Sequence, residues 1–304
     1  MKDIFNFLYC FDENYNFQAL TSMISLLDSV DEEINIYVIH PFEEFIDFVP
    51  EKILKHRNLN DFNVYKFKDY DHEFPNIDNV HISVATYYRL FIKNYLDNQI
   101  SNLVFLDPDV ICLANPISYL KEILFELKNS SFVIGARTEH SRGEKRIGVD
   151  GNYFNAGVMV IDFTKWIKND LHNNLISKLN EISNNILQWD QDVLNSFFNG
   201  KYLEIENKFN FKASSKSTKE YKDEIIFIHY IGSNKPWLTS GAFEKDSNFY
   251  HENFRKISNS SFHIEHKWKK ASIFDLFKAV INLKILKLKK PFIYIFEFIK
   301  SFFL

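Results

Sequence analysis

Two carboxylates follow an apolar stretch in the first half of the chain. Asp107 and Asp109 are spaced i, i+2 and come directly after the apolar run at residues 103–106. In an open α/β sheet, ligands gather beyond the carboxyl ends of the strands, which is where this pair would emerge. Two hard oxygen ligands suit Mg²⁺ or Mn²⁺. Taken alone, however, the Asp-Pro-Asp sequence is better explained as an acidic turn after a strand.

A second apolar run, at residues 225–228, ends in His229 and a turn that contains Gly232 and Lys235. His229 can donate a lone pair to a metal, and an imidazole added to two carboxylates shifts the preference toward Mn²⁺. Gly232 permits a close approach of the backbone to a ligand, and Lys235 can neutralise a phosphate oxygen. Taken singly, His229 is more often a structural residue and Lys235 a solvated one.

Two further segments carry polar groups next to apolar ones. Asp190, Gln191 and Asp192 precede an amphipathic stretch, and Asp190 is also a plausible helix N-cap, a role that would explain the acid by itself. The sequence Asn155-Ala156-Gly runs into the apolar residues 158–161, where a small residue would let the backbone approach a sugar.

Positioning these groups requires a sheet, and the chain alternates short apolar runs with longer segments of helical period. This pattern predicts an α/β fold with helices on both faces of the sheet. The predicted strands are residues 4–11, 34–40, 62–67, 103–106, 132–136, 153–162, 202–205 and 225–229, and the predicted helices are residues 17–29, 42–58, 80–95, 163–182 and 190–198.

The composition limits the class of protein. With 46% hydrophobic residues among 304, the chain can bury one large core, and a net charge of −4 gives no reason to expect a nucleic-acid partner. Cys10 and Cys112 are too few for a disulfide framework, so we expect buried thiols and a reducing cytoplasm. None of the eight glycines falls in a GxGxxG or GxxxxGK(S/T) arrangement. A bound nucleotide diphosphate would therefore need another positive charge, and a metal is the obvious candidate.

Six segments within residues 3–250 together resemble, in matching order, the bacterial galactosyltransferases of glycosyltransferase family 8, a retaining group with the GT-A fold that more distantly includes glycogenin. The segments are Asp12-Glu-Asn14-Tyr15, His81-Ile-Ser-Val-Ala-Thr-Tyr-Tyr-Arg89-Leu90, Leu106-Asp-Pro-Asp109, Tyr153-Phe-Asn-Ala-Gly157, Asp190-Gln-Asp192 and His229-Tyr-Ile-Gly-Ser-Asn-Lys-Pro-Trp237. The resemblance implies a mixed central sheet flanked by helices, and transfer of a hexose from a UDP-sugar, with galactose ahead of glucose, to a lipooligosaccharide or other glycolipid.

The same resemblance implies a role for each matching residue. Asp107, Asp109 and His229 would bind Mn²⁺, with Mg²⁺ as the alternative, while Gly232 and Lys235 would complete the diphosphate site. The remaining donor contacts would be Asp12 and Asn14 to uracil, and Arg89, Glu139, Asn155, Ala156, Asp190 and Gln191 around the sugar, with Asp190 and Gln191 as the catalytic pair. Glu139 stands where the family often has Asp. Because an amide is a poor nucleophile, we expect front-face attack, with Gln191 positioning the sugar.

The C-terminal segment, residues 256–304, differs from the catalytic domain predicted at residues 1–255. From residue 265 onward, nine lysines face three acidic residues, and the uncharged runs are far shorter than the ~20 residues that cross a bilayer. A basic, aromatic-rich segment of this kind predicts helices that lie on the inner face of the bacterial cell membrane, with Lys284, Lys287, Lys289 and Lys290 near the headgroups. The alternative is an ordinary helix packed on the catalytic domain or on a partner subunit.

Two other functions fit the same residues. One is a UDP-glucose-dependent glycosyltransferase that acts on a glycoprotein or on itself as a self-glucosylating primer. The other is a membrane protein that binds a UDP-sugar without turnover. The C-terminal segment favours a lipid-linked acceptor.

Overall fold

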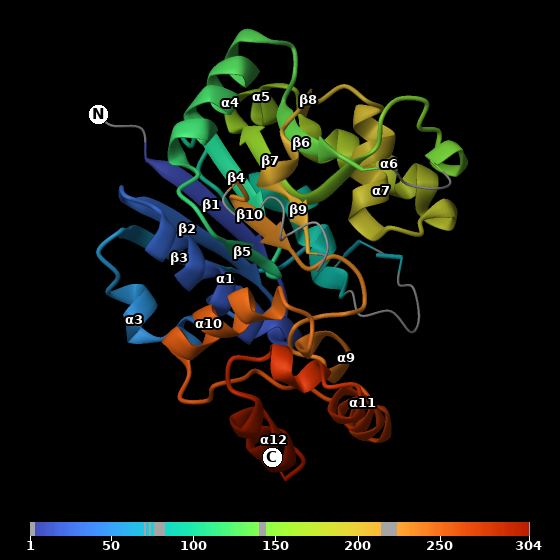
Figure 1. The fold of residues 1–304 in the computed structure, drawn as a ribbon. Helices are drawn as coiled ribbons and strands as arrows, with labels where there is room; N and C mark the ends of the chain where they lie inside the picture. Colours follow the sequence, from blue (N-terminus) through green and yellow to red (C-terminus); the bar gives the residue numbers. More distant parts are fainter. Residues whose placement is uncertain are drawn as a thin grey trace.

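In a computed structural model, which describes residues 4–69, 71–72, 74–75, 83–139, 144–213 and 224–303, a mixed seven-stranded sheet runs through the molecule (Figure 1). The strand order is β3-β2-β1-β4-β7-β6-β8, with β7 antiparallel to β4 and β6. The strands are β1 (Phe5–Cys10), β2 (Ile34–His40), β3 (Leu59–Lys66), β4 (Asn102–Leu106), β6 (Ile134–Thr138), β7 (Phe154–Asp162) and β8 (Leu203–Glu204).

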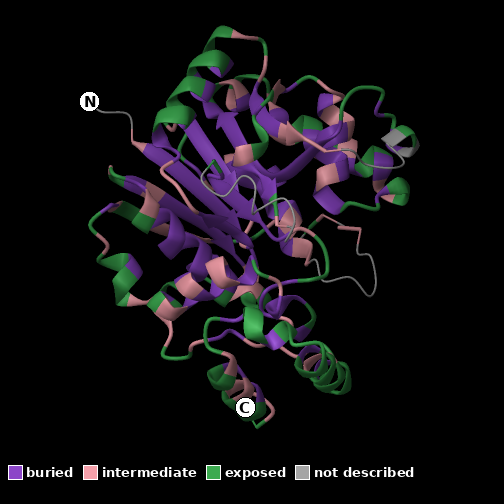
Figure 2. Cartoon of the chain, in the orientation of Figure 1, coloured by how far each residue is buried: buried purple, intermediate pink, exposed green. Residues whose placement is uncertain are grey.

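Helices cover both faces of this sheet. Successive side chains of a strand point to opposite faces, so the apolar strands present side chains that must be buried on each face. Leu8 and Phe105 belong to the core beneath the 3₁₀ helix η2 (Val84–Asn94) and the helices α6 (Leu171–Ile182) and α7 (Trp189–Phe198). Phe7 and Val104 belong to the core beneath α1 (Asn16–Ser29) and α4 (Ile117–Asn129). The central strands β1, β4 and β7 are therefore buried on both sides, whereas the edge strand β3 is only partly buried (Figure 2). This arrangement confirms the predicted α/β fold class with a central mixed sheet.

A small second sheet stands at the carboxyl end of β4. The turn after β4 leads into β5 (Val110–Cys112), which pairs with β10 (Phe227–His229), and β10 pairs in turn with β9 (Phe211–Lys212). Neither β5 nor β9 is long enough to show a periodic pattern in the sequence. This second sheet brings a late part of the chain next to the turn at residues 107–109.

Three predicted helices differ from the structure. Residues 42–58 form two short helices, α2 (Phe45–Phe48) and α3 (Glu51–Leu54), because Pro50 interrupts them. Residues 163–182 divide into α5 (Phe163–Lys168) and α6, where Asp170 adopts a left-handed φ of 48°. The stretch predicted at 80–95 is η2, a 3₁₀ helix, and residues 80–82 lie outside the described part of the chain. None of the predicted helices corresponds to α4.

The C-terminal segment folds back onto the rest of the protein. Helix α10 (Ser247–Ile257) packs on α1 and runs across residue 255; α11 (Lys269–Ile281), η6 (Lys284–Lys287) and α12 (Pro291–Lys300) follow it at the lower end of Figure 1. The rings of Phe243 and Phe262 each lie 5.1 Å from the ring of Tyr294 on α12. The inner side of the segment is thus a packed cluster that also contains α9 (Thr239–Ala242).

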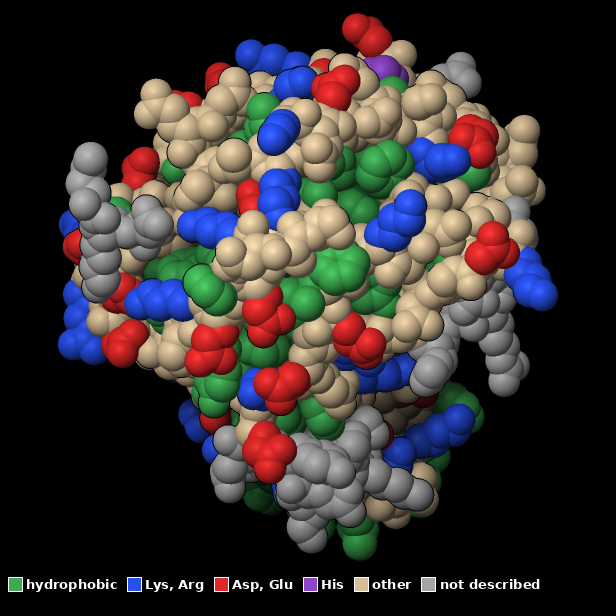
Figure 3. All heavy atoms as spheres, turned by 90° about the horizontal axis from the view of Figure 1, so that it is seen from above, with side chains coloured by type: hydrophobic (Ala, Val, Ile, Leu, Met, Phe, Trp, Pro, Cys, Tyr) green, Lys and Arg blue, Asp and Glu red, His purple; other side chains and the backbone are tan. Residues whose placement is uncertain are grey.

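Among the described residues, no helix has the length and hydrophobicity needed to cross a membrane. On the face of the molecule shown in Figure 3, Lys and Arg side chains are interspersed with Asp and Glu.

Candidate active site

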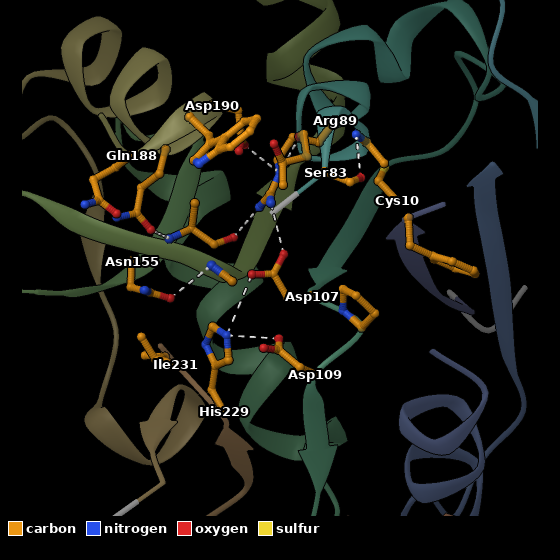
Figure 4. A pocket seen from close by; sticks show the side chains of 18 of the residues that line it. Cys10, Ser83, Arg89, Asp107, Asp109, Asn155, Gln188, Asp190, His229 and Ile231 are labelled. Carbon is orange, nitrogen blue, oxygen red and sulfur yellow. Dashed lines mark hydrogen bonds and ion pairs between the residues drawn. The ribbon is translucent and has the colours of Figure 1, made fainter. Parts of the chain in front are cut away.

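The turn that carries the two predicted carboxylates is fixed by backbone hydrogen bonds. The amide of Asp107 donates to the carbonyl of Gly157 at 2.8 Å, and the amide of Val110 donates to the carbonyl of Asp107 at 3.1 Å. Asp109 is buried, whereas the side chain of Asp107 is partly exposed. Both carboxylates therefore leave the end of β4 toward the same side, where β10 arrives (Figure 4).

The pairing of β5 with β10 brings His229 to these carboxylates, because His229 lies opposite Val110 in the ladder. Its Nε2 atom is 3.2 Å from Oδ1 of Asp109 and 3.7 Å from Oδ2 of Asp107. One ligand atom from each of the three residues lies within 4.8 Å of the others. Octahedral ligands at about 2.1 Å from a cation would be roughly 3 Å apart. The three groups therefore fit a divalent cation with small movements of the side chains.

The backbone of β7 closes one side of this group at Gly157. A Cβ atom built there would lie 2.2 Å from Cε1 of His229, 2.7 Å from its Nδ1 and 2.8 Å from Oδ2 of Asp107. Such distances are far inside normal contact, so only glycine leaves room for two of the three predicted ligands.

Lys235 lies on the other side of the acidic pair. Its Nζ donates to Oδ2 of Asp109 and, at 2.6 Å, to the carbonyl of Tyr230. Burial opposes the charge on Asp109, but Lys235 and His229 outweigh it, and the pKa of Asp109 lies well below its usual value. The carboxylate therefore stays ionised, as a metal ligand must.

Arg89 connects the acidic turn with α7. The buried guanidinium lies over the ring of Phe105, with Cζ 3.9 Å from the ring centroid. It contacts Asp107 at 2.9 Å, Asp190 at 2.7 Å and the carbonyl of Ala156 at 2.6 Å. Figure 4 shows Arg89 between the carboxylates of Asp107 and Asp190. Because η2 supplies Arg89, this helix places a cation between two acids that are far apart in sequence.

Asp190 and Gln191 lie in the first turn of α7, at the cavity wall. Burial raises the pKa of Asp190 to about 7, although the nearby Arg89 acts in the opposite direction. The side-chain oxygen of Gln191 accepts a hydrogen bond from the amide of Ala156 at 3.0 Å, and its nitrogen donates to the hydroxyl of Tyr153 at 3.2 Å. Both ends of the Gln191 amide are thus held.

Asn155 lies on β7, and Glu139 directly follows the adjacent strand β6. The side-chain nitrogen of Asn155 donates to Oε2 of Glu139 at 2.9 Å. The longer side chain of Glu139, noted as a departure from the family pattern, is therefore accommodated by a hydrogen bond to Asn155.

Most predicted site residues line one cavity of about 470 Å³. They are Arg89, Asp107, Asp109, Glu139, Asn155, Ala156, Asp190, Gln191, His229, Gly232 and Lys235. Asp12 and Asn14 are not among the residues that line it. Asp12 caps the 3₁₀ turn η1 (Glu13–Tyr15) by accepting from the amide of Asn14 at 3.1 Å, and Asn14 lines an adjoining cavity of about 380 Å³.

Several residues of the cavity wall have no role predicted from the sequence. Phe11 and Tyr15 line it near the end of β1, and Thr86 and Trp189 line it beside Arg89. These are ordinary core and turn residues whose placement depends on tertiary packing. The backbone of Trp189 has a left-handed φ of 54°, a conformation that a bulky side chain rarely adopts without a constraint. Cys10 and Cys112 are both buried free thiols, as expected.

A mixed sheet with helices on both faces, with an Asp-x-Asp turn and a histidine gathered around one cavity at the ends of strands, defines the GT-A fold class. The sequence model of glycosyl transferase family 8 matches residues 6–241, and the chain belongs to this family.

Curated relatives include a glucosyltransferase and a galactosyltransferase of lipopolysaccharide. The chain is 28% identical to a lipopolysaccharide 1,2-glucosyltransferase of Escherichia coli, over 78% of this chain and 74% of that protein. It is also 28% identical to a lipopolysaccharide 1,3-galactosyltransferase of Salmonella typhimurium, over 79% and 75%. Among solved structures, the galactosyltransferase LgtC in complex with donor and acceptor sugar analogs superposes with a TM-score of 0.70 at 21% identity, covering 87% of this chain and 99% of that one. This superposition supports the fold.

Proposed function

We propose that the protein is a retaining hexosyltransferase that transfers galactose, or else glucose, from a UDP-sugar with the help of a divalent cation, Mn²⁺ ahead of Mg²⁺. The observation that carries this proposal is the meeting of Asp107, Asp109 and His229 in the same cavity as Arg89 and Asp190. The curated relatives are named for glucosyl and galactosyl transfer, so both sugars remain candidate donors.

The residues divide between the two parts of the donor. A bound cation would supply positive charge to the leaving diphosphate, which replaces the general acid that glycosidases use. Lys235 lies beside Asp109 and would place its ammonium group at the same diphosphate. Asn155 and Asp190 line the same cavity, and the sugar would lie against them. Asp12 and Asn14 would contact uracil from the end of β1.

The contacts of Gln191 favour front-face attack over a covalent intermediate. Its carbonyl oxygen already accepts from the amide of Ala156, so the lone pairs of that oxygen are directed in part to the backbone. A neutral amide is also a poor nucleophile. Gln191 would therefore hold the sugar in place while the acceptor hydroxyl attacks from the side of the departing phosphate.

The test is a UDP-release assay with a panel of UDP-sugars in the presence of Mn²⁺, Mg²⁺ or a chelator. We expect release with UDP-galactose or UDP-glucose that the chelator abolishes, and loss of release in Asp109→Asn. Exposed Asp31 provides the matched control, because Asp31→Asn changes the same group away from the cavity. UDP-sugar binding without release for every donor would instead indicate a non-catalytic protein.

We further propose that the C-terminal segment attaches the enzyme to a membrane that carries a glycolipid acceptor. On α12, Phe292 and Phe296 are 84% and 69% exposed, on the side opposite the buried Tyr294 and Phe298. The outer side of α11 is similar, with Ile273, Phe274, Phe277 and Ile281 more than half exposed. An exposed apolar face on helices flanked by lysines is typical of segments that lie in the membrane interface.

The lysines of this segment are partly neutralised within the protein. Lys289 contacts Glu252, and Lys284 and Lys287 lie 3.9 and 3.8 Å from the carboxylate of Glu244. The apolar side chains should therefore contribute more to attachment than the charges on these lysines.

Sedimentation with anionic vesicles tests this proposal. We expect the quadruple Ser variant of Phe274, Phe277, Phe292 and Phe296 to lose most vesicle binding, since each buried Phe contributes roughly 1.5–3 kcal/mol. Phe125→Ser is the control, because Phe125 on α4 is also 69% exposed. Equal binding of the quadruple variant and the native chain would exclude attachment through this face.

A further inference from the structure

Asn210 lies behind the three predicted metal ligands and is completely buried. It follows the short 3₁₀ turn η5 (Asn207–Phe209) and directly precedes β9, the strand beside β10. Its side-chain nitrogen donates to Oδ1 of Asn155 at 2.7 Å, and its side-chain oxygen is 2.9 Å from Nδ1 of His229. Asn210 therefore joins the wall of the sugar site to the imidazole at the metal site.

Glu139, Asn155, Asn210 and His229 form a series of hydrogen bonds, and the carboxylate of Glu139 sets the direction of each bond in it. The carboxylate of Glu139 accepts from the nitrogen of Asn155, so the oxygen of Asn155 faces Asn210. That oxygen also accepts from the amide of Gly157 at 3.0 Å. Asn210 must then offer its nitrogen to Asn155 and its oxygen to His229. Since an oxygen can only accept, Nδ1 of His229 carries the proton.

In the neutral imidazole, which is the form that binds a metal, a proton on Nδ1 leaves the lone pair of His229 on Nε2. That atom faces Oδ1 of Asp109 at 3.2 Å and Oδ2 of Asp107 at 3.7 Å. Three acceptor atoms directed at one point form a favourable arrangement only around a cation. A hydrogen bond from the second ring nitrogen to an oxygen acceptor is also what orients a histidine that binds a metal.

We propose that Asn210 is the positioning residue of the metal site, and that it acts by fixing the tautomer and ring orientation of His229. Through Asn155 the same amide also orients the donor-sugar wall. This second part depends on the proposed function, whereas the first part concerns cation binding alone.

The first experiment measures Mn²⁺ binding to the full chain by electron paramagnetic resonance, without nucleotide. Asn210→Leu removes both hydrogen bonds, and we expect the dissociation constant of Mn²⁺ to rise about 10–100-fold, the usual effect of removing such a partner. The control is Asn58→Leu, because the buried Asn58 also donates two hydrogen bonds, to the carbonyls of Leu27 and Val30, away from the cavity. This control should leave Mn²⁺ binding unchanged.

A second variant separates the hydrogen bond between Asn210 and His229 from the one between Asn210 and Asn155. Asn210→Asp retains an acceptor for Nδ1 of His229 but loses the donor to Asn155. We expect Mn²⁺ to bind as tightly as in the native chain or more tightly, while the affinity for UDP-galactose falls relative to that for UDP in calorimetry. Nitrogen NMR of ¹⁵N-histidine, assigned with His229→Gln, should show the Nδ1-protonated form in the native chain and in Asn210→Asp.

Unchanged Mn²⁺ binding in Asn210→Leu, or an equal loss in Asn210→Leu and Asn210→Asp, would overturn the proposal. Should Asn210→Leu fail to fold, retention of Mn²⁺ binding in Asn210→Asp still supports the proposal and its loss still overturns it. Mn²⁺ binding that depends on Asn210 in a protein that releases no UDP would support this inference and contradict only the proposed function.

Discussion

Replacing Gly157 with alanine adds one methyl group at the point where the metal ligands are most crowded. The new Cβ would lie 2.2 Å from Cε1 of His229 and 2.8 Å from Oδ2 of Asp107. Carbon atoms in contact are about 3.5–4.0 Å apart, so the imidazole must move by more than about 1 Å. Metal sites tolerate deviations of only about 0.2 Å in the distance between metal and ligand. We therefore expect Gly157→Ala to lose a ligand and to weaken Mn²⁺ binding at least about 100-fold, or roughly 2.8 kcal/mol.

Mn²⁺ titration followed by electron paramagnetic resonance measures this effect, and UDP release should fall in parallel. Gly135→Ala is the matched control on the neighbouring strand β6. Its Cβ would lie 3.2 Å from methyl groups of Ile123 and Ile205, which can give way slightly, so stability changes modestly and Mn²⁺ binding does not. If Gly157→Ala folds and binds Mn²⁺ within threefold of the native chain, the assignment of the metal site is wrong.

Three further predictions concern stability. The pKa of Asp190 is raised from 3.8 to about 7, so between these pH values the folded protein keeps a proton that the unfolded chain releases. This group therefore lowers the free energy of unfolding as the pH rises from about 4 to 7. The melting temperature of Asp190→Asn should vary less with pH over this range than that of the native chain. Asn195→Leu should lower the free energy of unfolding, measured with urea, by about 2–4 kcal/mol, since it leaves the buried amide and carbonyl of Phe154 without their side-chain partner. A decrease below about 1 kcal/mol would contradict this account. A chain that ends at Ser258 should melt at a lower temperature because it exposes the core beneath α12, whereas Phe292→Ser should melt like the native chain.

The sequence by itself determined the scaffold and the chemical types at the site. Apolar runs of strand length predicted β1, β2, β4 and β7, because a strand buried on both faces must be apolar throughout. The Asp-Pro-Asp turn and His229 stand at strand ends, and the family resemblance indicated that they act together. The six motifs in matching order therefore predicted the fold and the family.

Tertiary structure decided how those groups meet. Only the pairing of β5 with β10 shows why His229 reaches Asp109, and only packing places Arg89 between Asp107 and Asp190. The role of Asn210 could not be predicted from the sequence. It depends on the hydrogen-bond partners of the buried amide, Asn155 and His229, which come from distant segments. Hydrophobic patterns report which side of an element is buried, whereas the direction of a hydrogen bond depends on three-dimensional neighbours that the pattern does not specify.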